Sequence, residues 1–277
     1  MGSLIAALAS FLDARSVNGA WLLRMEDLDP PRESVEAADQ ILFALDALGL
    51  HWDGPVLYQS NRYEAYHDAI AELKDRHLTF ACDCSRQQIQ DNGGIYPGTC
   101  RDLNQEIEPE LALRCRVMDV TMSFDDRIQG GQHQNLEREV GDFVIRRKDG
   151  LFAYQLAVVV DDAFQGITHV VRGIDLMDST PRQLYLQQQL DLPRPRYAHI
   201  PVIVNAQGQK LSKQHMASPI NPRNSAELLL EALTYLRQDP DPHLAAASAE
   251  DILAWACAHW HPDRLSGVTS LQECPTD

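Results

Sequence analysis

Helical segments alternate with short apolar segments through residues 1–77 of this 277-residue chain, and this alternation is the strongest constraint on its fold. Apolar spacing predicts helices at Ser3–Arg15, at about Ser34–Leu48 and within Asn61–Arg76. A short apolar strand, Trp21–Met25, separates the first two helices. Helices that alternate with short strands indicate a parallel α/β sheet. The buried positions of the second and third helices are predicted to be Val35, Ile41, Leu42, Leu45 and Leu48, and Tyr63, Tyr66, Ile70 and Leu73.

The alternation stops at Leu78, where a segment rich in turn residues and cysteine begins. Strands are expected at Val117–Phe124 and Asp142–Arg147, joined by the loop 125–135, which looks like antiparallel structure inserted between α/β units. Later helices are expected from Ser179-Thr180-Pro181, where a cap precedes a proline, and at Ser225–Leu236 and Ser248–His259. We therefore expect four parts: residues 1–77, 78–145, 146–214 and 215–277.

The composition is that of a soluble globular protein, with 44% apolar and 23% charged residues. No apolar run approaches the roughly 20 residues that span a bilayer, and the first residues lack the basic region of a secretory signal. A net charge of −16 argues against broad, non-specific binding of nucleic acid. Local basic surfaces are still conceivable at Arg146-Arg147-Lys148 and Arg194-Pro195-Arg196, although each could equally be an ordinary solvated face.

Three of the six cysteines, Cys82, Cys84 and Cys100, lie close together in the sequence. This clustering favours a metal site in a reducing cytoplasm over a disulfide framework, with three unrelated buried thiols as the alternative. Tetrahedral zinc needs four ligands. Candidates for the fourth are His77, Asp83, Tyr96 and Cys115. Such a site would be structural, because it would pin a loop too small to hold a core of its own.

Carboxylates follow the first expected strand in the segment RMEDLD, at Glu26, Asp27 and Asp29. Open α/β sheets bind their ligands at the carboxyl ends of strands, so Glu26 is a candidate to hold a substrate ammonium group. The simpler interpretation, that these acids only cap the following turn, fits Asp29 best.

Tyr154 and Arg172 lie on either side of a later apolar segment. Arg172 ends the expected strand Thr168–Val171, where it could contact a carboxylate at two points. The alternative is a structural ion pair with a nearby acid, Asp161, Asp162 or Asp175.

The segment QKLSKQ follows the expected turn Asn205–Gly208. Two lysines and a hydroxyl group suit a polyphosphate whose charge shifts during a reaction, although a short segment of this kind is usually a soluble turn.

Several segments together resemble the glutamyl-queuosine tRNA(Asp) synthetase family, shortened relatives of the class I glutamyl-tRNA synthetases. The resemblance extends from residue 2 to about residue 240 and rests on GSLIAALASFLDAR, RMEDLDPPRES, LGLHWDGPVLYQS, YPGTCR, residues 141–186 and QKLSKQ. It implies a Rossmann-type parallel sheet built from residues 1–77 and 146–214, whose first strand is missing from this sequence. It also implies a zinc-binding α+β insertion at 78–145 and a short C-terminal helical stem at 215–277.

The resemblance also implies roles for individual residues. The structural zinc ligands would be Cys82, Cys84, Tyr96 and Cys100. Glutamate would be bound by Glu26, Tyr154 and Arg172. ATP would be bound by Lys210, Ser212 and Lys213, and Lys213 would also be catalytic.

The implied reaction joins glutamate to ATP-Mg²⁺ to form glutamyl-adenylate and then transfers the glutamyl group to queuosine in the anticodon stem-loop of tRNA(Asp). The resemblance further implies a cytoplasmic monomer that does not bind membranes. Two alternatives are a fragment of a glutamyl-tRNA synthetase and a non-catalytic, zinc-bearing tRNA-binding remnant. The short stretch after Lys213 favours the modifying enzyme, because it is too small for a helical anticodon-binding domain.

The printed sequence departs from the family at its first residues, Met1-Gly2-Ser3. In the family, a first parallel strand and a His-x-Gly-His-type phosphate-binding motif come before this point. We expect a chain made as printed to fold poorly and to catalyse little, because several phosphate-binding groups and a central strand would be absent together. We therefore expect the natural start to lie upstream, with a truncated and inactive product as the alternative.

Overall fold

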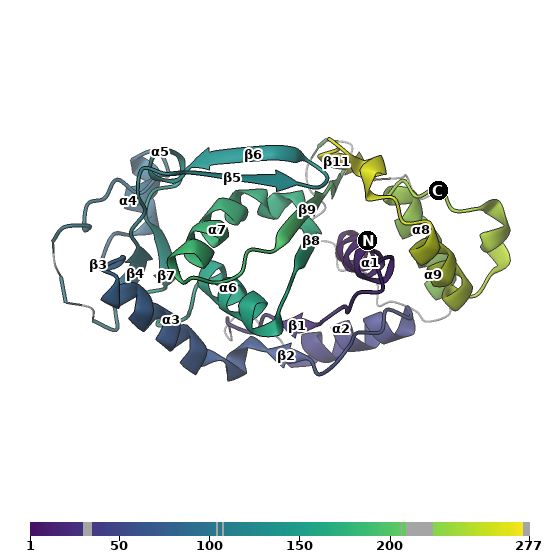
Figure 1. The fold of residues 1–277 in the computed structure, drawn as a ribbon, viewed down its shortest axis with the longest axis horizontal. Coiled ribbons are helices and arrows are strands. Elements are labelled where there is room, and N and C mark those ends of the chain that lie inside the picture. Colours follow the sequence, from purple (N-terminus) through teal and green to yellow (C-terminus); the bar gives the residue numbers. More distant parts are fainter. Residues whose placement is uncertain (30–34, 104, 107, 206, 209–223, 274–277) are drawn as a thin grey trace.

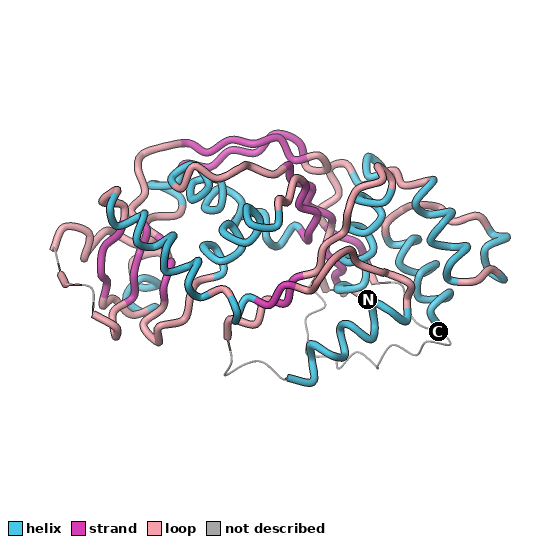
Figure 2. Tube along the Cα trace, turned by 60° about the horizontal axis from the view of Figure 1, so that its bottom comes forward, coloured by secondary structure: helices cyan, strands magenta, loops and turns pink. Residues whose placement is uncertain are grey.

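The computed structural model describes residues 1–29, 35–103, 105–106, 108–205, 207–208 and 224–273. The molecule is elongated in two views, with a small three-stranded sheet at one end and the C-terminal helices at the other (Figures 1 and 2). Among the described residues, no helix has the length and apolar character that a bilayer span requires.

The largest sheet has four strands in the order β6-β5-β9-β8. β8 (His169–Gly173) and β9 (Arg196–Ile200) are parallel, and β5 (Thr121–Asp126) is parallel to β9. A second parallel pair, β1 (Arg24–Met25) and β2 (Leu57–Tyr58), lies apart from this sheet. The expected parallel α/β architecture is confirmed, although the first strand is shorter than the predicted Trp21–Met25.

A cavity of about 1270 Å³ lies between β1 and β8. Within the described part of the chain, each of these strands pairs on one side only, and the two do not pair with each other. Leu23 and Arg24 line the cavity on one side, and Val170, Val171 and Arg172 line it on the other. The carboxyl ends of two parallel strands therefore open onto one space.

Helix α1 (Gly2–Arg15) confirms the first predicted helix and contacts β8. It is buried on several sides, as Leu8 and Phe11 show, which suits a helix between a sheet and other helices. Its Asp13 carboxylate accepts hydrogen bonds from Arg127 Nη1 (2.6 Å) and Trp260 Nε1 (3.0 Å), so α1 is tied to the β5–β6 turn and to the C-terminal region.

Helices α2 (Val35–Ala47) and α3 (Tyr63–Asp75) confirm the next two predicted helices. Two of their predicted core positions are wrong, because Ile41 is 49% exposed and Tyr63 is 37% exposed. Leu42 is only partly buried, and the side chain of Val35 lies outside the described part of the structure. Ile41 borders the cavity and is therefore not packed. The predicted positions that are buried are Leu45, Leu48, Tyr66, Ile70 and Leu73.

The inserted region forms an antiparallel sheet from β3 (Thr79–Cys82), β4 (Ala112–Cys115) and β7 (Phe143–Arg146). It also contains two short helices, α4 (Arg86–Asp91) and α5 (Leu136–Glu139). Antiparallel structure in this region is confirmed.

One boundary in the inserted region is wrong. The predicted loop 125–135 contains β6 (Gly130–Asn135), which pairs along its length with β5, and the predicted strand Val117–Phe124 is shifted toward the C-terminus. β6 has no apolar residue, so hydrophobic patterning could not reveal a strand that is held by backbone pairing.

Three later helices confirm the predictions: α7 (Thr180–Gln189), α8 (Ser225–Tyr235) and α9 (Ala249–Ala258). Helix α6 (Tyr154–Gln165) was not predicted, because its segment was recognised only as apolar. The Ser248 hydroxyl accepts a hydrogen bond from the Asp251 N–H and caps α9, as predicted. Two short strands, β10 (Val202–Val204) and β11 (Ser270–Gln272), form a parallel pair beside these helices.

Short 3₁₀ helices occur at η2 (Gln59–Asn61), η3 (Ile174–Ser179), η5 (Pro242–Ala246) and η6 (Pro262–Leu265).

Candidate active site

Three residues proposed from the sequence reach the cavity between β1 and β8. Glu26 follows β1, Tyr154 begins α6 and Arg172 lies near the end of β8, and all three line the cavity. They come from three elements that the parallel topology brings to one edge of the fold. The cavity exceeds the roughly 300–1,000 Å³ of a usual small-molecule site. Part of it is apolar, because α1 and α2 also contribute to its wall.

Arg172 is buried and held by four neighbours. Its Nε donates to His199 Nε2 (3.0 Å), and its Nη2 donates to Thr180 Oγ1 (2.8 Å) and the Leu176 carbonyl oxygen (3.3 Å). Its Nη1 donates to the Tyr154 hydroxyl at 3.3 Å. These hydrogen bonds fix the orientation of the Arg172 guanidinium at the cavity wall. Without them, the long arginine side chain could rotate freely.

Glu26 lines the same cavity and is paired with Arg24, with 3.6 Å between Glu26 Oε1 and Arg24 Nε. Partial removal from water raises the pKa of the Glu26 carboxyl, and the nearby charges of Arg24 and Arg172 oppose this rise. The side chain keeps 43% of its surface accessible to solvent, so it can be reached by a ligand in the cavity.

Burial raises the pKa of Tyr154 too, with Arg172 opposing the rise and Glu26 adding to it. Tyr154 is therefore a neutral hydroxyl at neutral pH that can donate a hydrogen bond. The cavity wall thus combines one anionic group with a guanidinium and a hydroxyl donor. This arrangement is complementary to an α-amino acid, whose ammonium group would face Glu26 and whose carboxylate would face Arg172 and Tyr154.

The other acids of RMEDLD have partners elsewhere. Asp27 accepts hydrogen bonds from the Ser60 N–H (2.9 Å) and hydroxyl (2.5 Å), so it joins the β1 segment to the turn after β2. Asp29 pairs with Arg147 Nη1 at 2.9 Å. Arg147 also pairs with Asp149, so within the candidate basic segment 146–148 this side chain is neutralised by acids.

The proposed ATP-binding residues Lys210, Ser212 and Lys213 lie outside the described residues.

The cysteine cluster lies at the end of the molecule that carries the three-stranded sheet, because Cys82 ends β3 (Figure 1). The Sγ atoms of Cys82, Cys84 and Cys100 lie within 4.8 Å of one another. The Tyr96 hydroxyl is 3.6 Å from Cys82 Sγ and accepts a hydrogen bond from the Cys100 N–H at 2.7 Å. Three thiols at this spacing are a donor set that a soft divalent metal ion can bind.

Of the other candidates for the fourth ligand, Asp83 lies beside the cysteine cluster and Cys115 does not. Asp83 is adjacent, with its Oδ1 3.3 Å from Cys100 Sγ. Cys115 is outside the group of three and packs in a different apolar cluster, beside Leu113 and Val117.

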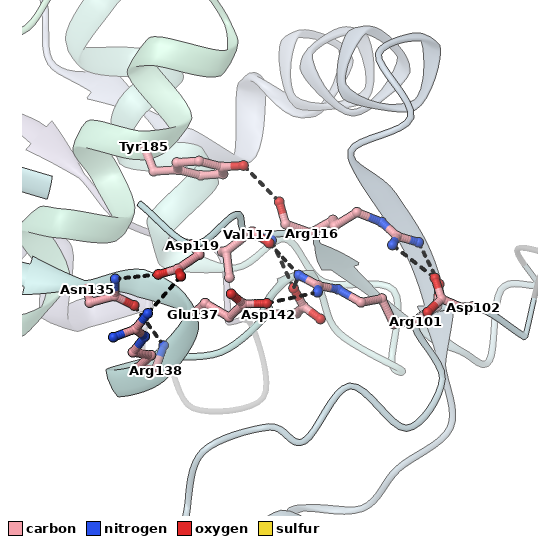
Figure 3. A network of polar contacts seen from close by, with 10 residues as sticks. All are labelled: Arg101, Asp102, Arg116, Val117, Asp119, Asn135, Glu137, Arg138, Asp142 and Tyr185. Atoms are coloured by element: carbon pink, nitrogen blue, oxygen red, sulfur yellow. Dashed lines mark hydrogen bonds and ion pairs between the residues drawn. The ribbon is translucent and has the colours of Figure 1, made fainter. Parts of the chain in front are cut away.

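Two arginines support the cysteine cluster. Arg114 Nε donates to Cys82 Sγ at 3.2 Å, and the guanidinium lies 4.0 Å from the centre of the Tyr96 ring. Burial opposes ionisation of Cys82, but the hydrogen bond from Arg114 and the contact with Tyr96 outweigh it, and the pKa of this thiol is lowered. Arg101, next to Cys100, pairs with Asp142 at 2.8 Å and anchors the loop to the strands beside it (Figure 3).

Sequence reasoning missed the residues that support Arg172. His199 is a buried polar residue inside an apolar strand, and Asp126 lies where a loop was predicted. A lone histidine in the segment HIPVIV is the one signal that could have drawn attention to this group. Arg24 was also passed over, although it lies within the segment whose carboxylates were considered.

Comparisons with known proteins place the chain in a family. The family model described as tRNA synthetases class I (E and Q), catalytic domain, matches residues 1–223. A Glutamyl-Q tRNA(Asp) synthetase from Pseudomonas putida is 53% identical over 272 residues, which cover 98% of this chain and 90% of the relative. The protein of the same name from Pseudomonas syringae pv. syringae is 50% identical over 276 residues, which cover 100% of this chain and 93% of that relative.

Solved structures show the same fold. A glutamate tRNA ligase from Elizabethkingia meningosepticum, in complex with its amino acid, superposes with a TM-score of 0.78 at 19% identity, over 97% of this chain. A glutamate-tRNA synthetase from Elizabethkingia anophelis superposes with a TM-score of 0.77 at 20% identity, over 98% of this chain. The present chain spans less than two thirds of each, 63% and 65%. From its sequence relatives and its catalytic-domain match, the chain belongs to the class I glutamyl- and glutaminyl-type tRNA synthetase family and, within it, to the glutamyl-Q tRNA(Asp) synthetases.

Proposed function

We propose that this protein activates glutamate with ATP-Mg²⁺ and transfers the glutamyl group to queuosine in the anticodon stem-loop of tRNA(Asp), as a cytoplasmic monomer. The supporting observation is that Glu26, Tyr154 and Arg172 line one cavity, which lies between the strands β1 and β8. The names of the relatives supply the substrate class, and the charges on the cavity wall match an amino acid.

In this proposal, glutamate is oriented from two sides. Glu26 takes the ammonium group, and Arg172 with Tyr154 takes a carboxylate. The other carboxylate attacks the α-phosphorus of ATP, so that a P–O bond forms and pyrophosphate leaves. The queuosine nucleophile then attacks the glutamyl carbonyl carbon, and AMP leaves. We assign ATP binding to Lys210, Ser212 and Lys213, with Lys213 stabilising the charge that develops on the phosphates.

We also propose that Cys82, Cys84, Tyr96 and Cys100 bind a structural zinc ion. The three thiols lie within reach of one ion, and the Tyr96 oxygen is beside them. The ion would stabilise the inserted region 78–145 by cross-linking a loop with few apolar contacts of its own. On this assignment, residues 1–77 and 146–214 form the catalytic domain and residues 215–277 a helical stem.

The test is glutamate-dependent exchange of pyrophosphate into ATP, followed by transfer of labelled glutamate to an isolated anticodon stem-loop that carries queuosine. From the protein as it is produced naturally, we expect exchange, and transfer that disappears when guanosine replaces queuosine. A requirement for the 3′ end of intact tRNA would instead identify an ordinary glutamyl-tRNA synthetase. Absence of exchange, from a folded chain, would identify a non-catalytic protein.

A pair of matched variants tests the glutamate site. Arg172→Lys keeps the charge but loses the planar fork, and we expect the KM for glutamate to rise by about tenfold or more while the KM for ATP changes little. The control is Arg264→Lys, because Arg264 pairs with Asp239 on the surface of the C-terminal region. Equal KM values for glutamate in the two variants would remove Arg172 from the site.

A further inference from the structure

A fully buried carboxylate–imidazole pair lies directly behind Arg172. Asp126, at the end of β5, and His199, in β9, have no solvent-exposed side-chain surface, and 2.6 Å separates Asp126 Oδ2 from His199 Nδ1. The opposite ring nitrogen, Nε2, is the acceptor for Arg172 Nε at 3.0 Å. The imidazole therefore stands between a buried acid and the arginine at the cavity wall.

The protonation state of this histidine follows from its neighbours. An arginine guanidinium only donates hydrogen bonds, so His199 Nε2 must carry a lone pair. The ring proton is then on Nδ1, where the Asp126 carboxylate accepts it. Thr180 Oγ1 accepts from Arg172 Nη2 and lies 3.3 Å from the same Nε2, which fits a hydroxyl that donates to that lone pair.

The Asp126 carboxylate is itself held in one orientation. Its Oδ1 accepts from the backbone N–H groups of Ile128 (3.1 Å), Gln129 (2.9 Å) and His199 (3.1 Å). This leaves Oδ2 to face the ring. The carboxylate is therefore fixed by backbone donors, and it fixes the tautomer of His199.

We propose that Asp126 and His199 are positioning residues for the proposed glutamate site: Asp126 holds His199 in the Nδ1–H tautomer, so that Nε2 holds the Arg172 guanidinium toward the cavity. This inference rests on the proposed function, because it gives Arg172 the task of binding a substrate carboxylate. The Arg172 guanidinium has five N–H hydrogens, and described neighbours accept hydrogen bonds from four of them. These four are the Nε hydrogen, both Nη2 hydrogens and one Nη1 hydrogen. The second Nη1 hydrogen is left for the substrate, beside the Tyr154 hydroxyl.

The Asp126→Asn substitution tests the proposal with little change in shape. Three backbone N–H groups require an acceptor at the Oδ1 position, so the new amide nitrogen must face His199 Nδ1 and donate to it. The ring proton then moves to Nε2, opposite the Arg172 Nε–H, and two donors meet. We expect glutamate affinity, measured by calorimetry with glutamate alone, to fall by about tenfold to a hundredfold, because a charged hydrogen bond is lost and a buried donor is left unpaired.

The control is Asp142→Asn, the same substitution at another buried acid. Asp142 also accepts from a backbone N–H, that of Val117 at 2.8 Å, and from Arg101, but it is not among the residues that line the cavity (Figure 3). We expect Asp142→Asn to lower thermal stability while glutamate affinity stays within about twofold of the original protein. A loss of affinity equal to that of Asp126→Asn would mean that destabilisation explains the effect and would overturn the proposal.

Two substitutions at His199 separate positioning from packing. In His199→Gln, the side-chain oxygen can still accept from Arg172, whereas in His199→Leu it cannot. We expect His199→Gln to retain more affinity for glutamate than His199→Leu. In the His199→Gln background, Asp126→Asn should have less effect than alone, since no ring tautomer remains to be reversed. Equal affinities for the two His199 variants would overturn the proposal.

NMR spectroscopy provides a readout without substrate. The ¹⁵N shifts of the imidazole should report an Nδ1–H tautomer in the original protein and an Nε2–H tautomer in Asp126→Asn, together with faster exchange of the Arg172 Nε–H. If the original protein binds no glutamate, the proposed function fails, and these NMR signals still decide the positioning role. An unchanged tautomer, or a changed tautomer with unchanged Arg172 exchange, would overturn it.

Discussion

Arg24 Nη2 lies 2.9 Å from Asp162 Oδ1, and this ion pair joins β1 to α6 at the wall of the cavity between β1 and β8. Both side chains are mostly buried, with 14% and 8% of their surfaces exposed. Burial raises the pKa of Asp162, and the charge of Arg24 opposes the rise. Because β1 and β8 do not pair directly, this ion pair is one of the contacts that set the position of Glu26 relative to Arg172.

Removing only Arg24 should therefore lower the free energy of unfolding more than removing Arg24 and Asp162 together. We expect Arg24→Met to lower the free energy of unfolding by roughly 3–5 kcal/mol, because it leaves the Asp162 carboxylate buried without its partner. The double variant Arg24→Met/Asp162→Leu should lose less, since no buried charge remains. Urea denaturation of the three proteins measures both values. A double variant as unstable as the single one would show that the charge is not the cause.

A surface pair provides the comparison for this experiment. Arg264 and Asp239 lie 2.8 Å apart, but 40% and 84% of their side-chain surfaces are exposed. We expect Arg264→Met to change the free energy of unfolding by less than about 1 kcal/mol, because water screens the interaction.

The proposed zinc site predicts a dependence on individual cysteines. We expect Cys84→Ser to lose bound zinc and to lower the melting temperature, because a metal ion that binds only the folded state stabilises it. Tyr96→Phe should weaken zinc binding less than Cys84→Ser, since all three thiols remain. Zinc content after purification and melting temperature with and without a chelator are the measurements.

The control for the zinc experiment is Cys257→Ser, because Cys257 lies on α9, outside the cysteine cluster. Its zinc content should match that of the original protein. Full zinc occupancy in Cys84→Ser would remove this cysteine from the ligand set.

Buried tyrosines should make the protein sensitive to alkali. Burial raises the pKa of Tyr66, Tyr154 and Tyr185, and raises that of Tyr197 to about 12. Between the ordinary tyrosine pKa of about 10 and this value, the native state keeps a proton that the unfolded chain has lost. The unfolded state binds fewer protons in this range. Each tyrosine therefore makes its full contribution to the free energy of unfolding below about pH 10, and this contribution falls as pH rises, by up to about 1.4 kcal/mol per pH unit.

The variant Tyr197→Phe isolates one of these contributions. It loses a hydrogen bond from Gln187 Nε2 (3.2 Å), so it should be less stable than the original protein at neutral pH. Its free energy of unfolding should then decline less steeply between about pH 10 and pH 12. Urea denaturation across this range gives the slope, and identical slopes for the two proteins would contradict the assignment to Tyr197.

The sequence predicted most helices well because the signals involved are local. Apolar spacing revealed α1 and α3, and Ser248 marked the start of α9 through a hydrogen bond to a residue three positions away. The strand β6 was missed because it has no apolar residue and is held by the backbone of β5. Ile41 was wrongly placed in the core because periodicity cannot show that a cavity lies beside a helix.

By itself, the sequence determined the resemblance to the family, through quoted segments such as RMEDLDPPRES and QKLSKQ. It also determined most of the helices and the residue types at the candidate sites, since these depend on spacing over a few residues. Only the tertiary structure decided how Arg172 is held. Arg24 contacts an acid 138 positions away, and His199 contacts one 73 positions away. Such contacts form only after packing brings distant elements together and removes water, which makes an unpaired buried polar group costly.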